Sequence, residues 1–203
     1  MAAAERDATY TMGRSEGETE RLIEQAHLYE KMTLRMLRDA VIGRLVLMYL
    51  ADPAEVLRGF AAHVRAGGIV AFQEAEMTLY ETIAHPETPV VNKLVEWGLE
   101  VFRRSGANIG MGLELQGAFV GAGLPSPVAN LEAPAGGGPD WVGYEYLQQG
   151  FASLLPLIES FGIATAAEVG VDTVAERLRQ EAAASGRLIV LPPHVTAYAR
   201  VPA

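Results

Sequence analysis

The stretch VIGRLVLMYLADPAEVLRGFAAHVRAGGIVAFQE, residues Val41–Glu74, decides the fold of this chain. Its first residues, Val41 and Ile42, predict a short strand, because apolar β-branched side chains favour extended backbone. Gly43 and Arg44 follow and end the strand, since glycine interrupts regular structure. The stretch therefore opens with a buried strand that leads into a loop.

A helix and a second strand come next. Asp52 is a helix N-cap, and Pro53 occupies the first helical position. Apolar residues then recur at helical spacing, at Val56, Leu57, Phe60, Ala61 and Val64. Gly67 and Gly68 end the helix, and the continuous apolar run Ile69–Phe72 is typical of a parallel strand buried on both faces. The order strand, helix, strand predicts a right-handed βαβ unit.

These segments resemble a known family, the class I S-adenosylmethionine-dependent methyltransferases of small molecules. Asp39–Pro53 is similar to the family's fourth strand, and Leu57–Glu74 is similar to the following helix and the fifth strand. Thr9–Leu37 resembles the lead-in helix, and His194–Pro202 resembles the last antiparallel strand. The resemblance implies an α/β fold. We expect a partial Rossmann-like methyltransferase sheet, with strands equivalent to the family's fourth to seventh and with flanking helices.

The family's cofactor signature is missing from the place where the resemblance implies it. That signature is a strand, a glycine-rich loop and a helix, followed by a second strand that ends in an acidic residue. Here Leu37 leads through Asp39 and Ala40 directly into the expected fourth strand. Each βα unit needs about 30 residues, so about 60 to 90 residues, or three strands with their helices, are absent. We interpret this as an internal deletion, natural or engineered.

The expected organisation is a flexible arm followed by one domain. Residues 1–16 form the arm, and residues 17–203 form a single truncated methyltransferase-like domain. Within that domain we expect a lead-in helix at 17–39, the strand-helix-strand unit at 40–74, and substrate-side helices with terminal strands at 75–203.

Composition limits the classes of partner. The formal net charge is −9 and the arginines are scattered, which disfavours nucleic acid as a partner. No run of eighteen apolar residues exists, so we expect no membrane span. The absence of cysteine excludes disulfides and fits a cytoplasmic location. The four histidines lie far apart in the sequence, so no metal site is expected.

The resemblance implies a set of residues near S-adenosylmethionine. Gly43 and Arg44 follow the expected fourth strand, a position that lies beside the methyl donor in the family. Tyr10, Arg21 and Gln25 match the lead-in segment, which can fold over the bound cofactor. The structural alternatives are a solvated cap at Arg44 and a solvated helix face in the lead-in segment.

A second set of residues is expected near the substrate. Gln73 and Glu74 end the second strand of the βαβ unit, where ligands of open α/β sheets bind. Tyr80 and His85 lie in the loop that follows. We expect Gln73, Glu74 and Tyr80 to contact substrate, and Glu74 and His85 to be the catalytic candidates, with His85 as a base. The alternatives are an exposed loop carboxylate at Glu74 and a solvated histidine at His85.

Three functions stay open from the sequence. The first is methyl transfer from S-adenosylmethionine to a small molecule, which the missing cofactor loop opposes. The second is a non-catalytic remnant of the same fold that binds a ligand or dimerises. The third is an unrelated α/β enzyme.

The deletion would also leave Val41 and Ile42 on a bare strand edge. We therefore expect either that the lead-in helix covers this edge or that two chains pair there.

Overall fold

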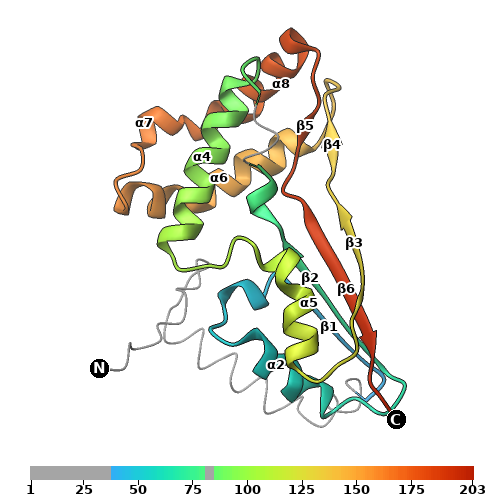
Figure 1. Ribbon diagram of the computed structural model, residues 1–203. Coiled ribbons are helices and arrows are strands. Elements are labelled where there is room, and N and C mark those ends of the chain that lie inside the picture. Colours follow the sequence, from blue (N-terminus) through green and yellow to red (C-terminus); the bar gives the residue numbers. More distant parts are fainter. Residues whose placement is uncertain (1–37, 81–84) are drawn as a thin grey trace. The chain divides into compact units, whose positions relative to one another are not determined.

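The computed structural model describes residues 38–80 and 85–203 (Figure 1). Residues 17–37 of the expected lead-in helix lie outside these residues, and its last two, Arg38 and Asp39, form a turn. Contact clustering divides the described residues into two compact units. The first unit contains residues 38–74, 111–131 and 195–203, and the second contains residues 75–80, 85–110 and 132–194.

The first unit is built on a four-stranded sheet. Its strand order is β1-β2-β6-β3, where the strands are β1 (Ala40–Arg44), β2 (Ile69–Ala75), β6 (His194–Arg200) and β3 (Val128–Glu132). β1 and β2 run parallel, and Val41 pairs with Val70. The connection between them contains the 3-10 helix η1 (Leu47–Tyr49) and α2 (Pro53–Ala61), so the predicted strand-helix-strand unit is confirmed.

The C-terminal strand runs antiparallel to β2. The Gly67 N–H donates to the carbonyl of Val201 at 2.8 Å, and the Glu76 N–H donates to the carbonyl of Pro193 at 2.8 Å. Residue numbers fall along the C-terminal strand, from 201 to 193, where they rise along β2, from 67 to 76. The two strands therefore run in opposite directions. The direction expected for this strand is confirmed. The sheet is therefore mixed, and the fold is α/β with flanking helices.

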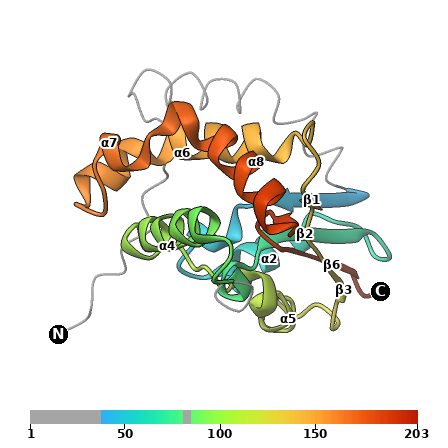
Figure 2. The same cartoon turned by 90° about the horizontal axis from the view of Figure 1, so that it is seen from above.

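Two helices pack beside the sheet in this unit. The side chain of Asp52 accepts a hydrogen bond from the Glu55 N–H at 2.8 Å, which confirms the predicted N-cap of α2. The ring centroids of Phe60 on α2 and Phe72 on β2 lie 6.1 Å apart, so α2 covers the face of the sheet that contains Phe72. α5 (Met111–Gly121) lies against α2, and Arg58 donates to the carbonyl of Gly121 at 2.8 Å (Figures 1 and 2).

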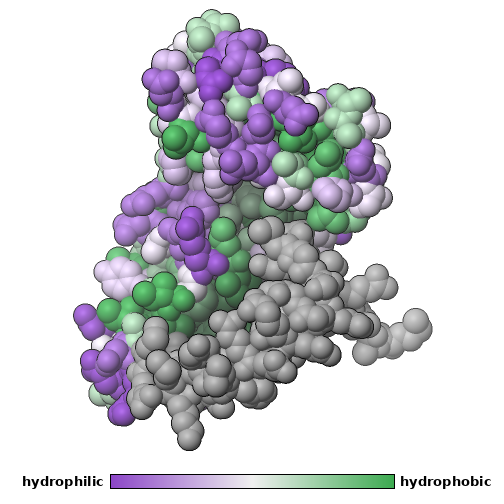
Figure 3. Space-filling model, turned by 180° about the vertical axis from the view of Figure 1, so that it is seen from behind, coloured by the Kyte–Doolittle hydropathy of each residue, from purple (hydrophilic) through white to green (hydrophobic). Residues whose placement is uncertain are grey.

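β1 stands at one end of the strand order. Val41 is buried, whereas Ile42 is 80% exposed. Other large apolar side chains of the first unit are exposed as well, at Val46, Leu113, Val120, Val128, Leu131 and Tyr198. The green areas of Figure 3 show apolar residues at the surface on one side of the molecule. Among the described residues, none pairs with the outer edge of β1.

The second unit is mainly helical. Its longer helices are α4 (Pro89–Arg104), α6 (Gly143–Ser160) and α8 (Val174–Ser185), and its shorter ones are η2 (Met77–Leu79), α7 (Ala166–Val169) and η3 (Val171–Thr173). β4 (Ala135–Gly136) pairs antiparallel with β5 (Ile189–Val190). α4, α6 and α8 contact one another, and they enclose a core that includes Leu94, Trp97, Tyr144, Phe151, Ile158 and Leu178.

Glycines leave room for aromatic rings in both units. A Cβ atom at Gly43 would lie 2.0 Å from the ring of Phe72, which is its pairing partner in β2. A Cβ atom at Gly136 would lie 2.5 Å from the ring of Trp141, and one at Gly143 would lie 2.3 Å from it. Real Cβ atoms do not approach other atoms so closely, so these positions require glycine for packing.

The Gly43 position gives a test of this packing. Gly43→Ala forces the Phe72 ring out of its place, and we expect it to lower the free energy of unfolding by about 1–3 kcal/mol. Gly59→Ala is the matched control, because a Cβ atom there meets nothing within 4 Å and Gly59 lies inside α2. The control should raise stability by about 0.5–1 kcal/mol. Urea unfolding of both variants makes the measurement, and equal effects at the two positions would contradict it.

Candidate functional site

A pocket of about 820 Å³ lies within the second unit. Its walls come from α4, from Gly162 and Ile163 after α6, and from Arg187 to Val190 around β5. Tyr80 and His85 also line it, so the structure brings these two predicted site residues together. The volume is in the range of pockets for small organic molecules.

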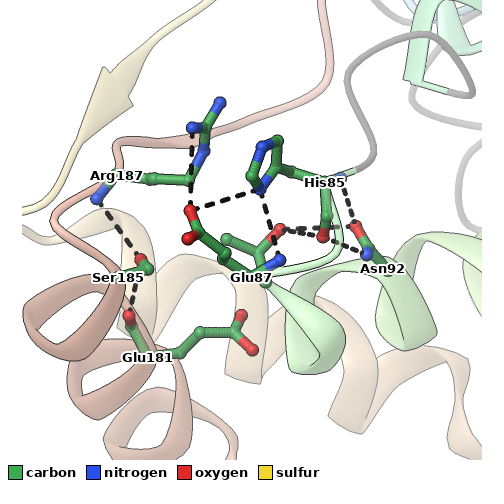
Figure 4. Close-up of polar contacts among 7 residues, drawn as sticks. His85, Glu87, Asn92, Glu181, Ser185 and Arg187 are labelled. Carbon is green, nitrogen blue, oxygen red and sulfur yellow. Dashed lines mark hydrogen bonds and ion pairs between the residues drawn. The ribbon is translucent and has the colours of Figure 1, made fainter.

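The backbone of His85 is held in place by α4. The side chain of Asn92 accepts from the His85 N–H at 3.3 Å and donates to the His85 carbonyl at 2.6 Å. The Thr88 N–H also donates to that carbonyl, at 3.0 Å. The Asn92 side chain thus bonds both backbone groups of His85, as a neighbouring strand would. These bonds fix the backbone of His85 relative to the first turn of α4 (Figure 4).

The start of α4 is stabilised by a buried carboxylate from α8. Glu181 is 9% exposed, and its two oxygens accept from the Val90 N–H at 2.6 Å and the Val91 N–H at 3.0 Å. The first N–H groups of a helix have no partner within the helix, and a carboxylate there is favoured by the helix dipole. Glu181 therefore fixes the end of α4 that supports Asn92 and His85.

The imidazole of His85 faces Glu87 through one nitrogen. Nδ1 lies 3.2 Å from the Glu87 backbone nitrogen, which donates to it, and 3.6 Å from Oε2 of the Glu87 side chain. An Nδ1 that accepts a hydrogen bond leaves the proton of the neutral ring on Nε2. Arg187 lies at the same carboxylate, with one guanidinium nitrogen 4.0 Å from Glu87 Oε2 (Figure 4). His85, Glu87 and Arg187 therefore form one cluster.

Tyr80 lines the pocket and is bonded to β5. It is buried, and its hydroxyl donates to the carbonyl of Val190 at 2.9 Å. Burial, with a smaller contribution from Tyr146, raises the pKa of Tyr80. Its hydroxyl is therefore a neutral donor that is already used by the protein backbone, while its contact with a substrate stays a prediction.

Glu74 occupies a structural position in the first unit. Its side chain is fully buried, and its oxygens accept from the backbone N–H groups of Val46 at 3.0 Å, Leu47 at 2.9 Å and Met48 at 3.3 Å. The chain turns toward Glu74 at Leu45, whose φ of 53° is unusual for a residue with a side chain. Successive N–H groups in such a turn form an anion-binding concavity. The expected alternative of an exposed carboxylate is wrong, because these N–H groups bind it in the interior.

Burial raises the pKa of the Glu74 carboxyl above its ordinary value, and the three N–H donors act in the opposite direction. The donors match a carboxylate, whereas the buried surroundings penalise its charge. Burial and the three N–H donors therefore shift the Glu74 pKa in opposite directions, and burial has the larger effect.

The other residues predicted near a cofactor or substrate also have structural partners. Gly43 accommodates the Phe72 ring. Arg44 is exposed and pairs in register with Gln73, whose amide donates to the Thr196 hydroxyl at 2.8 Å. The structure therefore brings Gly43, Arg44, Gln73 and Glu74 together at the carboxyl ends of β1 and β2.

Three predicted cofactor residues, Tyr10, Arg21 and Gln25, lie outside the described residues. Within 38–80 and 85–203, no group of three or more acidic or histidine side chains could hold a metal ion. In the same part of the chain, no helix has both the length and the apolar character needed to cross a membrane.

The described residues do not fit S-adenosylmethionine at the end of β1. The space at Gly43 is filled by Phe72, and the oxygens of Glu74 are bonded to the backbone. Trp141 likewise fills the space at Gly136 in β4 and at Gly143 in α6. These glycines accommodate side chains of the protein itself.

Comparisons with known proteins place few limits on this chain. No protein-family model matches it, and no curated protein matches it. Among solved structures it is similar to Haemonchus contortus phosphoethanolamine N-methyltransferase 2 in complex with phosphomonomethylethanolamine and S-adenosylhomocysteine, with 11% sequence identity and a TM-score of 0.38. The match covers 81% of this chain and 34% of that chain, so this chain spans about a third of its length. A similarity of this degree carries no functional conclusion.

Sequence reasoning missed several residues of the pocket. Glu181 binds the backbone of Val90, which is 91 positions away, and Asn92 binds the backbone of His85 across a turn. Arg187 lies beside Glu87, which is 100 positions away in the sequence. A local signal existed for the position of Arg187 alone, since Gly186 ends α8 in a left-handed conformation just before it. Nothing local indicates which group it approaches.

The raised pKa of Glu74 predicts a pH dependence of stability. The Glu74 carboxyl keeps its proton to a higher pH in the folded state than in the unfolded chain, where its pKa is near 4.5. The stabilising contribution of proton binding is therefore complete below that value and is lost as the pH rises through the folded pKa. We expect the unfolding free energy of the wild type, minus that of Glu74→Gln, to fall as the pH rises above about 4.5.

Denaturant unfolding at several pH values measures this difference. Glu132→Gln is the control, because Glu132 is an exposed carboxylate of β3. A difference that grows with pH would mean that the three N–H donors outweigh burial at Glu74.

Proposed function

We propose that this chain is a ligand-binding protein built on the substrate-side half of a methyltransferase-like fold, and that it binds a small organic molecule in the pocket of the second unit. The pocket of about 820 Å³ is the observation that supports this proposal. Its polar residues are fixed by neighbouring elements, as His85 is by Asn92. Preorganised polar groups beside apolar side chains are typical of small-molecule sites.

The methyltransferase-like part of the proposal rests on the first unit. A parallel β1-β2 pair joined through α2, followed by an antiparallel C-terminal strand beside β2, agrees with the order that the resemblance implies. We propose that β1 and β2 correspond to the family's fourth and fifth strands and that β3 and β6 complete the set up to the seventh. The lack of cysteine supports a cytoplasmic location as part of the same proposal.

Methyl transfer from S-adenosylmethionine is the second candidate function. The exposed Arg44 and the side chain of Gln73 at the carboxyl ends of parallel strands favour it, because ligands of open α/β sheets bind there. The filled space at Gly43 opposes it. We derive no catalytic step for Glu74 or His85, and their catalytic roles stay predictions.

Tryptophan fluorescence tests binding in the pocket. Trp97 lines the pocket and Trp141 does not, and the chain contains two tryptophans. In Trp141→Phe, the remaining Trp97 should change its emission when a fragment set of aromatic and aliphatic molecules is titrated. Trp97→Phe is the matched control and should give no change. An unchanged Trp97 emission with every fragment, together with no shift in melting temperature, would contradict the proposal.

A titration with S-adenosylhomocysteine separates the two candidate functions. A ligand at a hundred times its dissociation constant raises the unfolding free energy by about 2.7 kcal/mol, which is a readily measured thermal shift. We expect no shift at millimolar concentration. A clear shift that Gly43→Val abolishes, with Gly59→Val as control, would instead support cofactor binding at the end of β1.

We also propose that two copies of the chain pair through the outer edge of β1. The exposed Ile42 on a strand at the end of the sheet order supports it. Light scattering should show a dimer for the wild type and a monomer for Ile42→Lys, because a lysine on an edge strand disfavours pairing. A wild-type monomer would contradict this part of the proposal and leave the ligand pocket unaffected.

A further inference from the structure

We infer that the pocket of the second unit takes a small organic acid, with an apolar body against α4 and β5 and an acidic oxygen bound by His85 and Arg187. This inference rests on the proposed function, since it specifies the ligand of the same pocket. It follows from the hydrogen-bonding groups of the wall that the protein leaves available.

The carboxylates of the pocket wall already have cationic partners. Lys93 bonds both oxygens of Glu96, at 3.1 and 2.9 Å. Arg104 bonds Glu100 at 2.6 Å and also donates to the carbonyl of Phe161 at 2.6 Å. Neither carboxylate therefore offers a free negative charge to a ligand, and the guanidinium of Arg104 is held by the protein.

The neutral polar groups of the wall are also used within the protein. Asn92 bonds both backbone groups of His85, and the hydroxyl of Thr88 donates to the His85 carbonyl at 3.1 Å. The Tyr80 hydroxyl donates to Val190. Asn92 and Thr88 position His85, and all three side chains have little hydrogen-bonding capacity left for a ligand.

Among the described residues, His85 and Arg187 offer donors at the wall. With Nδ1 of His85 turned toward Glu87, the ring presents Nε2 as a donor, and no polar group among the described residues contacts Nε2. The Arg187 side chain is 46% exposed, and among those residues its guanidinium has one charged partner, Glu87 at the long distance of 4.0 Å. A guanidinium has five N–H donors, so most of them are open to a ligand.

The available donors and the apolar wall together define the ligand class. Arginine binds carboxylates through paired hydrogen bonds, and a neighbouring imidazole N–H adds a third. Apolar side chains make up another part of the wall, namely Val91, Val95, Leu99, Ile163, Ile189 and Val190. An aromatic or branched aliphatic monocarboxylate satisfies both features, whereas a cation would meet Arg187 with like charge.

Matched probes test the inference. Isothermal titration compares 3-phenylpropanoate with 3-phenylpropanamide, which have the same shape and differ in charge. We expect the wild type to bind the carboxylate at least about tenfold more tightly than the amide, because charge-assisted hydrogen bonds are stronger than neutral ones. Arg187→Gln should remove this preference and leave amide binding unchanged. Arg65→Gln is the control, since it removes an exposed arginine of the first unit and should retain the preference.

The outcomes separate the inference from the proposed function. Equal affinity of the wild type for the two probes, or a preference that survives in Arg187→Gln, would overturn the acid inference while the pocket still binds small molecules. Failure of both probes, together with unchanged Trp97 fluorescence across the fragment set, would overturn both. His85→Phe gives an independent check: it should weaken carboxylate binding more than amide binding, and an equal loss for both probes would contradict the assigned donor.

Discussion

The buried carboxylate of Glu74 is the contact on which the first unit depends. It lies at the end of β2 and binds three successive N–H groups just after β1, so it ties the ends of the two parallel strands together. Without it the N–H groups of the buried Leu47 and Met48 would lack partners, which costs about 1–3 kcal/mol for each group. The left-handed turn at Leu45 persists because this carboxylate compensates for its conformational cost. A residue at the expected position of catalysis thus has a structural task.

The second unit uses the same device for a different purpose. Glu181 on α8 binds the first N–H groups of α4, and α4 in turn holds His85 through Asn92. The pocket is therefore supported by a chain of polar contacts from one helix to the next, and the imidazole at its end is fixed before any ligand arrives. Such preorganisation lowers the entropy lost on binding.

Local contacts could be predicted from the sequence, whereas distant partners could not. Asp52 and Pro53 predict the start of α2, because an N-cap joins residues three positions apart, and the structure confirms it. Pro89 likewise stands at the first position of α4. Glu74 contacts backbone groups 26 to 28 positions away, so no nearby pattern distinguishes it from an exposed carboxylate. Arg187 was missed for the same reason, since only the fold brings it to Glu87.

The glycines show why a motif alone does not identify a ligand. A glycine signals that something approaches the backbone closely, but it does not say what. At Gly43 the approaching group is Phe72, and at Gly136 and Gly143 it is Trp141. The space at these glycines is therefore closed by the protein's own rings, whereas His85 and Arg187 line an open volume. Open volume with available donors is the stronger indication of a ligand, because it is a feature that internal packing does not explain.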